Sequence, residues 1–300
     1  MNDKPALWPT MRANSARLYV LIARKAGRAV VFRRGPTKRT LVLTWDLRTD
    51  TLVPGQWLKG RIYERRADLS PDGELLVYAA AKGGSELTSW VAVSRPPYLT
   101  ALALWTEAGM WGGGLFGKDW RSLQLNLLSW EVADKDRSAG SVSSKLRVSR
   151  LHPYLDELRL SLMRLQREGW DITLGERKKL PRTARYGYVF DPPIVQTKAL
   201  RAGWTLVVEM HAANESNGRL YVETASVRGA DGVIKAQLGR VDWADIDLKG
   251  DIILAREGCL SRLKISQLAN DAPSEPSLIA DLNDLSFRPL ETPAKALRWP

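Results

Sequence analysis

The sequence predicts an all-β protein, and three observations point to this class. Two segments that start 177 residues apart, Ala67 to Tyr78 and Ala244 to Ala255, share an Ala-Asp pair, a turn that ends in Gly, and an apolar run. Gly suits a turn position that requires a positive φ, so each segment predicts a strand, a turn and a second strand. Short apolar runs between turn residues fill most of the remaining chain. At 300 residues, 44% of them apolar, the chain can bury the core of one large domain or two ordinary ones.

The first third of the chain predicts two groups of strands. Between Arg17 and Asp46, basic turn sequences separate three apolar runs, as in a meander. These runs are Leu18 to Ala23, Ala29 to Phe32 and Leu41 to Trp45. The second group contains four runs, which are Tyr63 to Leu69, Leu75 to Ala80, Trp90 to Ser94 and Leu99 to Trp105. It spans about 45 residues, the length of one blade of a β-propeller.

One segment departs from the strand pattern and predicts an amphipathic helix. Its leucines recur at alternating steps of four and three, at Leu151, Leu155, Leu158, Leu162 and Leu165. Five charged residues lie off this stripe, namely Asp156, Glu157, Arg159, Arg164 and Arg167. Packing on its own domain is the default for such a helix, and presenting its apolar face to a partner is the alternative. The polar stretch Asp134 to Ser144 before the helix predicts a linker.

Strand character resumes after the helix at Trp204 to Met210, Leu220 to Ser226 and Val233 to Leu238. It continues through the second Ala-Asp segment to Ile265. The chain from Asn270 onward is rich in proline, which predicts an extended tail that wraps over the domain surface.

The segment from Leu69 to Tyr78, with its Ser-Pro-Asp-Gly turn, resembles the S-P-D-G strand-turn-strand element of bacterial β-propeller repeats, which are related to WD-repeat propellers. The second segment keeps Ala-Asp, the Gly and the apolar run, but has Asp-Leu-Lys in place of Ser-Pro-Asp. The resemblance covers about a tenth of the chain and the start points lie roughly four blade lengths apart. It implies an irregular β-propeller of five or six blades with a helical insertion, and brings no catalytic residues. Paired β-sandwich domains are the fallback.

The expected organisation has four parts. Residues 1–130 form the N-terminal blades, and residues 131–190 form the linker and the helical insertion. Residues 191–269 form the C-terminal blades, and residues 270–300 form the proline-rich tail.

The numbers of cysteines and histidines indicate the cellular compartment and limit the disulfide and zinc sites that the chain can form. Cys259 is the only cysteine, so no internal disulfide can form, and two histidines cannot complete a Cys/His zinc site. The first apolar run, Leu18 to Ala23, is far shorter than a signal-peptide core or a membrane span. We therefore expect a protein of a reducing cytoplasm with no membrane association.

A glycine pattern gives a weak signal for a cofactor. Gly112, Gly114 and Gly117 spell G-x-G-x-x-G, which in a dinucleotide-binding unit opens a helix. Apolar and polar residues alternate from Leu123 to Leu127, which is strand periodicity. The glycines therefore predict a loop between strands, and no cofactor is expected.

The acids and histidines predict no metal or catalytic site. Four aspartates crowd the turn 242–251, but Lys249 stands where a calcium loop needs its third acid, and Arg256 stands where it needs glutamate. His152 and His211 lie in no recognisable catalytic pattern. A carboxylate pair in a propeller channel remains the open route to an enzyme, although a non-enzymatic role is favoured.

The net charge of +12 is concentrated at the N-terminus, because residues 1–66 hold 15 Lys and Arg against 4 Asp and Glu. Clustered cations favour a polyanionic partner such as nucleic acid. The candidate binding residues are Arg24, Lys25, Arg28, Arg33, Arg34, Lys38, Arg39, Trp57, Lys59 and Arg61. Trp57 is included because a ring beside cations can stack on bases. In a meander the two turns lie at opposite ends of the middle strand, roughly 20 Å apart, so these cations should form two clusters.

Two functions follow as hypotheses. The first is a non-enzymatic platform for protein partners in a bacterial-type cytoplasmic complex, argued from the propeller fold alone. The alternative is nucleic-acid or other polyanion binding through the basic N-terminal segment. Protection of edge strands by Lys and Arg would explain the same charges without a partner.

Overall fold

The structure is a computed structural model that describes residues 11–12, 14–35, 38–83, 88–106, 111–128, 142–181, 184–215, 220–268 and 275–300. The chain divides into two compact units, which we describe separately. Unit 1 comprises Met1–Leu18 and Gly169–Asp284, and unit 2 comprises Tyr19–Glu168 and Leu285–Pro300. Much of the predicted linker, 134–144, lies outside the described residues.

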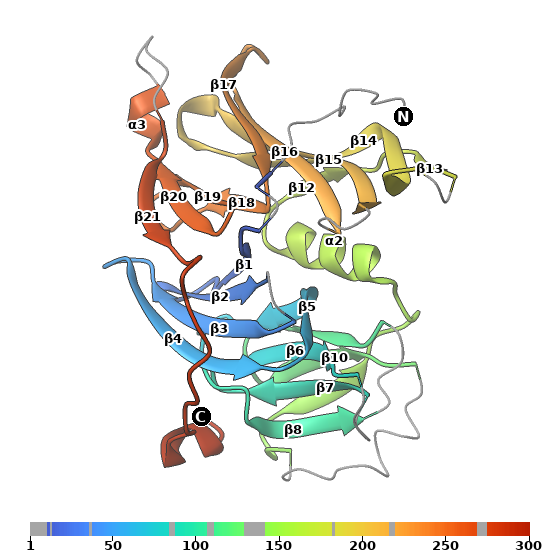
Figure 1. Ribbon diagram of the computed structural model, residues 1–300, viewed down its shortest axis with the longest axis vertical. Helices are drawn as coiled ribbons and strands as arrows, with labels where there is room; N and C mark the ends of the chain where they lie inside the picture. Colours follow the sequence, from blue (N-terminus) through green and yellow to red (C-terminus); the bar gives the residue numbers. More distant parts are fainter. Residues whose placement is uncertain are drawn as a thin grey trace. The chain divides into compact units, whose positions relative to one another are not determined.

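Unit 2 contains two four-stranded meanders in which each strand neighbours the next in the chain (Figure 1). The strands of the first are β1 (Arg17–Ile22), β2 (Arg28–Arg34), β3 (Thr40–Asp46) and β4 (Thr51–Leu58). The strands of the second are β5 (Arg61–Leu69), β6 (Leu76–Ala81), β7 (Ser89–Ser94) and β8 (Ala101–Thr106). The strands predicted from the apolar runs are confirmed in both meanders, because each run supplies the buried residues of one strand.

Strand β4 has no counterpart among the predicted strands. Its sequence contains Pro54 and Gly55, which normally argue against a central strand. The strand lies at the edge of its sheet, where a proline loses no hydrogen bond to a further strand. Gly55 is also required by contact, because a Cβ atom there would lie 2.1 Å from the carbonyl oxygen of Pro97.

A third sheet in unit 2 packs against the second meander. It contains β9 (Gly113–Phe116), β10 (Ser122–Asn126) and β11 (Arg147–Arg150), with β10 and β11 parallel. One apolar core joins side chains of β6, β7 and β8 to Phe116, Leu123 and Leu125. The two sheets therefore share a core, as in a sandwich. Strand β10 confirms the strand predicted after the glycine pattern, but the predicted glycine loop is wrong at Gly114, which lies in β9 and pairs with Leu125.

The predicted helix forms in unit 2 as α2 (Glu157–Arg167) and packs on β5. Asp156 caps its N-terminus by accepting a hydrogen bond from the backbone N–H of Arg159. The buried face includes Glu157 and Arg164 as well as leucines, so two charges that lie off the predicted leucine stripe are inside the protein. The helix docks on its own unit, the default for an amphipathic helix.

Unit 1 contains a six-stranded sheet and a four-stranded sheet. The six strands are β12 (Asp171–Thr173), β13 (Arg177–Lys179), β14 (Tyr186–Ala199), β15 (Thr205–Glu215), β16 (Tyr221–Arg228) and β17 (Ile234–Val241). The four-stranded sheet contains β18 (Trp243–Ile246), β19 (Ile252–Arg256), β20 (Cys259–Leu263) and β21 (Ser277–Asp281). A short helix, α3 (Ile265–Leu268), follows β20.

The two similar segments fold as hairpins, one in each unit, and the turn in unit 2 is one residue longer than the turn in unit 1. In unit 2, Ser70 N–H donates to the carbonyl of Leu75 at 2.8 Å, and Gly73 adopts a φ of 75°. In unit 1, Asp247 N–H donates to the carbonyl of Asp251 at 2.9 Å, and Gly250 adopts a φ of 84°. The strand-turn-strand prediction is confirmed for both, with Gly at the positive-φ position.

The closed propeller predicted from the spacing of these segments is wrong. The described residues form five sheets of four, three, six, four and four strands, and none of them is closed. A propeller would need similar blades, whereas the chain between the two hairpins forms a three-stranded sheet with a parallel pair, a helix, and a sheet built around the 14-residue strand β14. The distance between the two segments is a length of chain, and this length does not determine how many sheets the chain forms. The all-β class is confirmed, and the fallback of β-sandwich domains fits.

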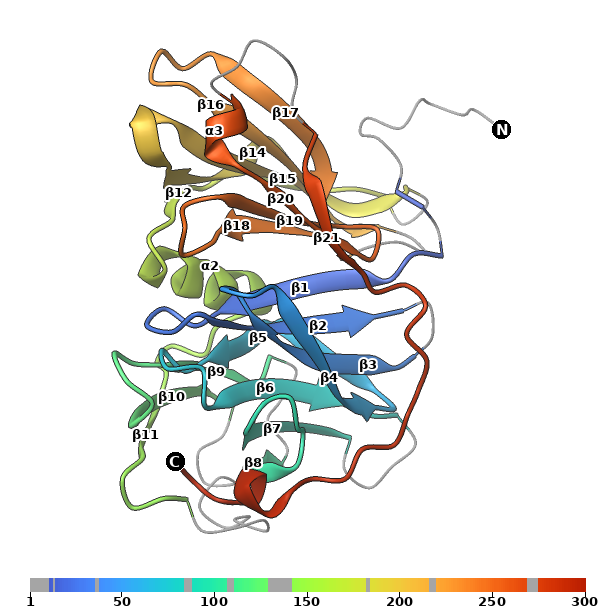
Figure 2. The ribbon, with the colours of Figure 1, turned by 90° about the vertical axis from the view of Figure 1, so that its left-hand side faces the viewer.

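The C-terminal segment 285–300 belongs to unit 2, where Figure 2 shows it passing the ends of β3 and β4 and reaching β8. The amide of Gln56 donates to the carbonyl of Leu290 at 2.9 Å and to the hydroxyl of Thr292 at 2.8 Å. Ala296 is buried, and Trp299 packs against the core of the second meander. Among the described residues, no helix has the length and apolar character needed to cross a membrane.

Candidate anion-binding site

The basic residues predicted to bind a partner lie at the two ends of β2, in agreement with the meander geometry. Arg24, Lys25 and Arg28 surround the turn between β1 and β2. Arg34, Lys38 and Arg39 surround the connection between β2 and β3. The two groups differ in what their cationic ends contact.

The cations at the β1–β2 turn bind the chain itself. Arg24 donates from Nη2 to the carbonyl of Gly117 at 2.9 Å, and Lys25 donates from Nζ to the carbonyl of Lys118 at 2.9 Å. Arg28 forms an ion pair with Glu74. Burial lowers the pKa of Arg24, and the nearby charge of Arg167 lowers it further. These contacts give the first group a structural role.

The second group is joined by Trp57, Lys59 and Arg61, because the strand register brings them to the same end of the sheet. Leu41 on β3 pairs with Arg33 on one side and with Trp57 on the other. Cross-strand partners project to the same face, so the Arg33 guanidinium reaches the Trp57 ring, at 5.6 Å from its centroid. Arg33 is itself buried, with 3% of its surface exposed, and therefore supports the ring from inside.

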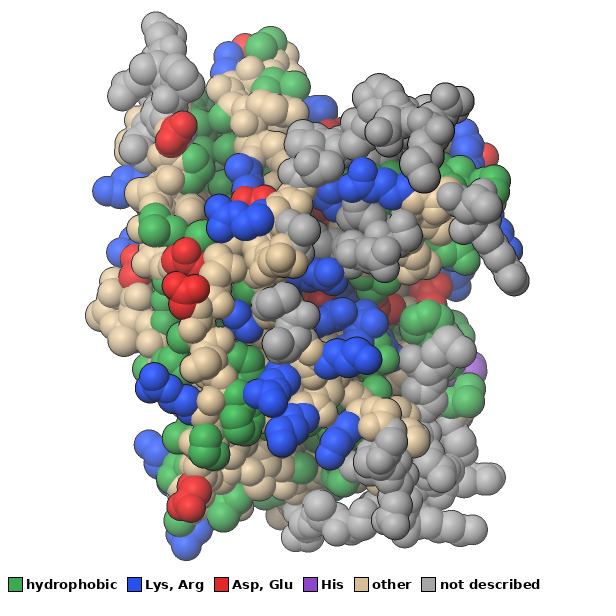
Figure 3. Space-filling model, viewed as in Figure 1, with side chains coloured by type: hydrophobic (Ala, Val, Ile, Leu, Met, Phe, Trp, Pro, Cys, Tyr) green, Lys and Arg blue, Asp and Glu red, His purple; other side chains and the backbone are tan. Residues whose placement is uncertain are grey.

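Four cations of this group line a pocket of about 330 Å³ in unit 2. We call it the cationic pocket, and its lining residues are Arg34, Lys38, Arg39, Gly60, Arg61, Ala81 and Gly83. None of these described residues is acidic. The lining comes from the end of β2, the loop to β3, the β4–β5 turn and the end of β6. Figure 3 shows Lys and Arg side chains gathered on the face over β5 and β6 of unit 2.

The tight β4–β5 turn positions Arg61. A Cβ atom at Gly60 would lie 2.7 Å from the carbonyl oxygen of Ala81, so glycine allows the turn to approach the end of β6. Thr40 donates from its hydroxyl to the carbonyl of Gly60 at 3.3 Å. Arg61 follows directly and begins β5, with its guanidinium 4.5 Å from the centroid of the Tyr63 ring.

The electrostatics of the cationic pocket favour an anion. Burial lowers the pKa of Arg34; the carboxylate of Glu64 opposes this effect, and the neighbouring charge of Arg61 adds to it. Arg61 also has a buried Nε atom without a hydrogen-bond partner among the described residues. Two neighbouring guanidinium groups that repel one another and retain donor capacity are stabilised when a phosphate or carboxylate enters.

An aromatic pair lies beside the cationic pocket. It consists of Trp57 and Phe287, whose ring centroids are 6.3 Å apart with an angle of 59° between the planes. Arg39 lies 4.7 Å and Lys59 lies 5.7 Å from the centroid of the Phe287 ring. Phe287 is 38% exposed. Arg39 thus belongs both to the cationic pocket and to the surroundings of the aromatic pair.

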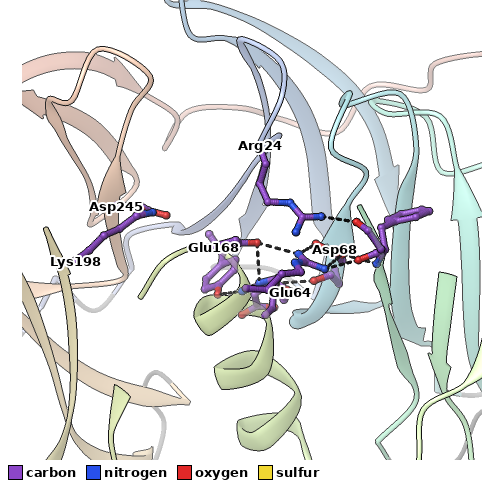
Figure 4. Close-up of polar contacts among 12 residues, drawn as sticks. Arg24, Glu64, Asp68, Glu168, Lys198 and Asp245 are labelled. Carbon is purple, nitrogen blue, oxygen red and sulfur yellow. Dashed lines mark hydrogen bonds and ion pairs between the residues drawn. The ribbon is translucent and has the colours of Figure 1, made fainter. Parts of the chain in front are cut away.

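A second charged cluster in unit 2 is buried and stabilises the fold. Asp68 accepts hydrogen bonds from Nη1 and Nη2 of Arg167 at 2.8 and 2.7 Å, and from the backbone N–H of Phe116 at 2.6 Å. Arg164 donates to the carbonyl of Ala67 at 2.6 Å and to the hydroxyl of Tyr19. Figure 4 shows these groups converging between α2 and β5. The cluster connects α2 to three sheets of its unit, at Tyr19 on β1, Asp68 on β5 and Phe116 on β9.

The pKa directions in this cluster follow from burial and pairing. Burial alone would lower the pKa of Arg167, but the Asp68 carboxylate outweighs it, and the net effect is a raised pKa. Burial raises the pKa of Glu157, and the charge of Glu64 adds to this rise. The Arg66 guanidinium, whose Nε atom lies 3.1 Å from Oε2 of Glu157, opposes it.

The acidic turn of unit 1 is occupied by internal contacts. Asp245 accepts a hydrogen bond from Nζ of Lys198 at 2.7 Å, a pair also shown in Figure 4. Asp247 accepts from Nε of Arg262 at 3.2 Å and from the backbone N–H of Lys249 at 2.8 Å. Within the described part of the chain, no three His, Cys, Asp or Glu side chains form a group that could hold a metal.

The histidines lie apart from both charged clusters. His152 is exposed and precedes α2. In unit 1, Nε2 of His211 is 2.8 Å from Oγ1 of Thr224, and burial lowers the pKa of His211 while Glu209 and Glu223 oppose the change.

Phe287 is the site residue that the sequence did not identify. Its contact with Arg39 joins residues 248 positions apart, which no local pattern reveals. The proline-rich composition of the tail indicated an extended wrap over the domain, and this was the available signal. Trp57 and Lys59 were among the predicted residues, but their contacts with Phe287 could not be deduced from the sequence.

Comparisons with known proteins leave the function to be argued from these residues. No family model matches the sequence, and no curated protein matches it. Among solved structures, the uncharacterized protein lmo1340 from Listeria monocytogenes EGD-e is similar over 94% of this chain and 87% of that chain, with 12% identity and a TM-score of 0.29. We draw neither fold nor function from a similarity this low.

Proposed function

We propose that unit 2 binds a phosphate-bearing polyanion at the cationic pocket. The observation that carries this proposal is the convergence of four cations, from three separate parts of the chain, on one pocket with no acidic residue among its described lining. Cations that serve only for solubility are usually interspersed with acids and spread over a surface. An anionic ligand would stabilise the charges of Arg34 and Arg61 further, in addition to the Glu64 carboxylate.

Size and donor geometry support phosphate as the recognised group. A volume of about 330 Å³ lies at the small end of ligand pockets and accommodates a phosphate with its flanking atoms. Three arginines offer planar, two-pronged donors that match phosphate oxygens, and Lys38 adds a mobile point charge at the rim.

The test is a calorimetric titration of the full chain with inorganic polyphosphate at several salt concentrations. Four neutralised phosphates would give a slope of log affinity against log salt of roughly −3, so the affinity should fall about 50-fold between about 50 and 200 mM salt. Absent binding, or binding that is insensitive to salt, would contradict the proposal.

The platform for protein partners stays a prediction. We predicted it from the broad faces of a closed propeller, and the open sheets do not provide such faces. A cytoplasmic location likewise remains a prediction from the cysteine usage, with Cys259 as the only cysteine.

A further inference from the structure

We infer that the polyanion bound by unit 2 is a single-stranded nucleic acid, with a phosphate in the cationic pocket and an adjacent base stacked at Phe287. This inference rests on the proposed function and adds the class of ligand. It is carried by the aromatic pair, which a site for bare phosphate chains would not need.

The first step is the exposure of Phe287. Phe287 keeps 38% of its surface exposed, and it lies on a segment that Gln56 binds at Leu290 and Thr292. Gln56 fixes the chain three residues later through its bond to the carbonyl of Leu290, and Trp299 anchors the end in the core. Gln56 on β4 and Trp299 in the C-terminal segment therefore keep the Phe287 ring at the surface.

The second step is the support beneath the rings. The Trp57 ring contacts both the buried guanidinium of Arg33, 5.6 Å from its centroid, and the Phe287 ring, 6.3 Å from its centroid. A ring supported in this way loses little conformational entropy when a further planar group stacks on the pair. Stacking platforms for single strands have this composition of rings and cations.

The third step is the position of Arg39. Its guanidinium lines the cationic pocket and lies 4.7 Å from the centroid of the Phe287 ring. A phosphate held by Arg39 would therefore place its own nucleotide beside that ring. Lys59, 5.7 Å from the same centroid, provides a cation for the next phosphate along the strand.

The recessed shape of the site favours a single strand over a duplex. A duplex keeps its bases stacked inside and presents phosphates on a stiff outer rim, so it cannot offer a free base to Phe287. A single strand can bend a phosphate into the pocket and turn a base outward to the ring.

The test compares Phe287→Ala, Phe287→Leu and Phe287→Tyr with the unaltered chain. The ligands are a fluorescent single-stranded oligonucleotide, the duplex of the same sequence, and inorganic polyphosphate. Loss of stacking should weaken oligonucleotide binding about 5- to 150-fold in the Ala and Leu variants, whereas Tyr retains the ring and should retain the affinity. Polyphosphate affinity should stay within about twofold in all three, because the cations are unchanged.

The outcomes separate the two proposals. If polyphosphate binds but Phe287→Ala leaves oligonucleotide affinity unchanged, or if the duplex binds as well as the single strand, the assignment to single strands is wrong and the proposed polyanion site stands. If no polyanion binds the unaltered chain, both proposals fail. Thermal melting of each variant establishes that the tail is still folded onto unit 2.

Discussion

Replacing Asp68 with alanine is expected to lower the free energy of unfolding of unit 2 by about 3–5 kcal/mol. The side chain of Asp68 is 2% exposed and receives both Nη groups of Arg167. Its removal takes an acceptor away from the partly buried guanidinium of Arg167 and from the backbone N–H of Phe116. Unfolding in urea, followed by tryptophan fluorescence, measures the effect.

The matched control is Asp245→Ala, at the corresponding position of the hairpin in unit 1. Asp245 accepts a single hydrogen bond from Lys198, whereas Asp68 accepts two from Arg167. We expect roughly half the destabilisation or less. Equal losses of unfolding free energy in the two variants would show that the contacts of Asp68 contribute no more to stability than those of Asp245.

Reversing two charges at the cationic pocket is expected to weaken polyanion binding at least about 100-fold, since each charged hydrogen bond contributes about 1.5–3 kcal/mol. The variant is Lys38→Glu with Arg39→Glu. Lys38 is exposed and Arg39 is half-buried in the loop after β2, so the fold should tolerate both changes. The slope of log affinity against log salt should also shrink by about one for each lost phosphate contact.

The control for net charge is the double variant Lys145→Glu with Lys249→Glu. Both lysines are exposed and lie outside the cationic pocket, and the change in net charge is the same. Its affinity should stay within about threefold of the unaltered chain, because distant exposed charges are screened. Comparable losses in both double variants would mean that binding depends on overall charge and not on the pocket.

Local features of the fold could be predicted from the sequence. Apolar runs bounded by turn residues located β1 to β3 and β5 to β8, because a strand with a buried face is defined by its own residues. Gly73 and Gly250 located the two turns, because a positive φ selects glycine. The helix α2 was located by Leu158, Leu162 and Leu165 of the predicted stripe, whereas Leu151 and Leu155 precede it and the buried Leu160 was not in the stripe.

Features that depend on distant parts of the chain could not be predicted. Strand β4 tolerates Pro54 only because it is an edge strand, and edge position is a property of the sheet. Arg164 and Glu157 interrupt the apolar pattern of α2 yet are buried, because their partners lie on other elements. The number of sheets likewise could not be derived from the spacing of two similar hairpins.

The candidate site was predicted in part. The basic residues around the β2–β3 connection were recognised from their density, and the meander geometry separated them from those of the β1–β2 turn. The structure adds their convergence on a pocket, the internal role of Arg33, and the contribution of Phe287. These additions come from register and tail packing, which the local sequence does not encode.

The most direct measurement is photo-cross-linking of a single-stranded oligonucleotide to the full chain, followed by mass spectrometry of the linked peptides. We expect cross-links in the peptides that contain Arg39, Trp57 and Phe287. These cross-links should be lost in the Lys38→Glu, Arg39→Glu variant. Cross-links confined to unit 1, for example to the basic edge strand β13, would contradict it.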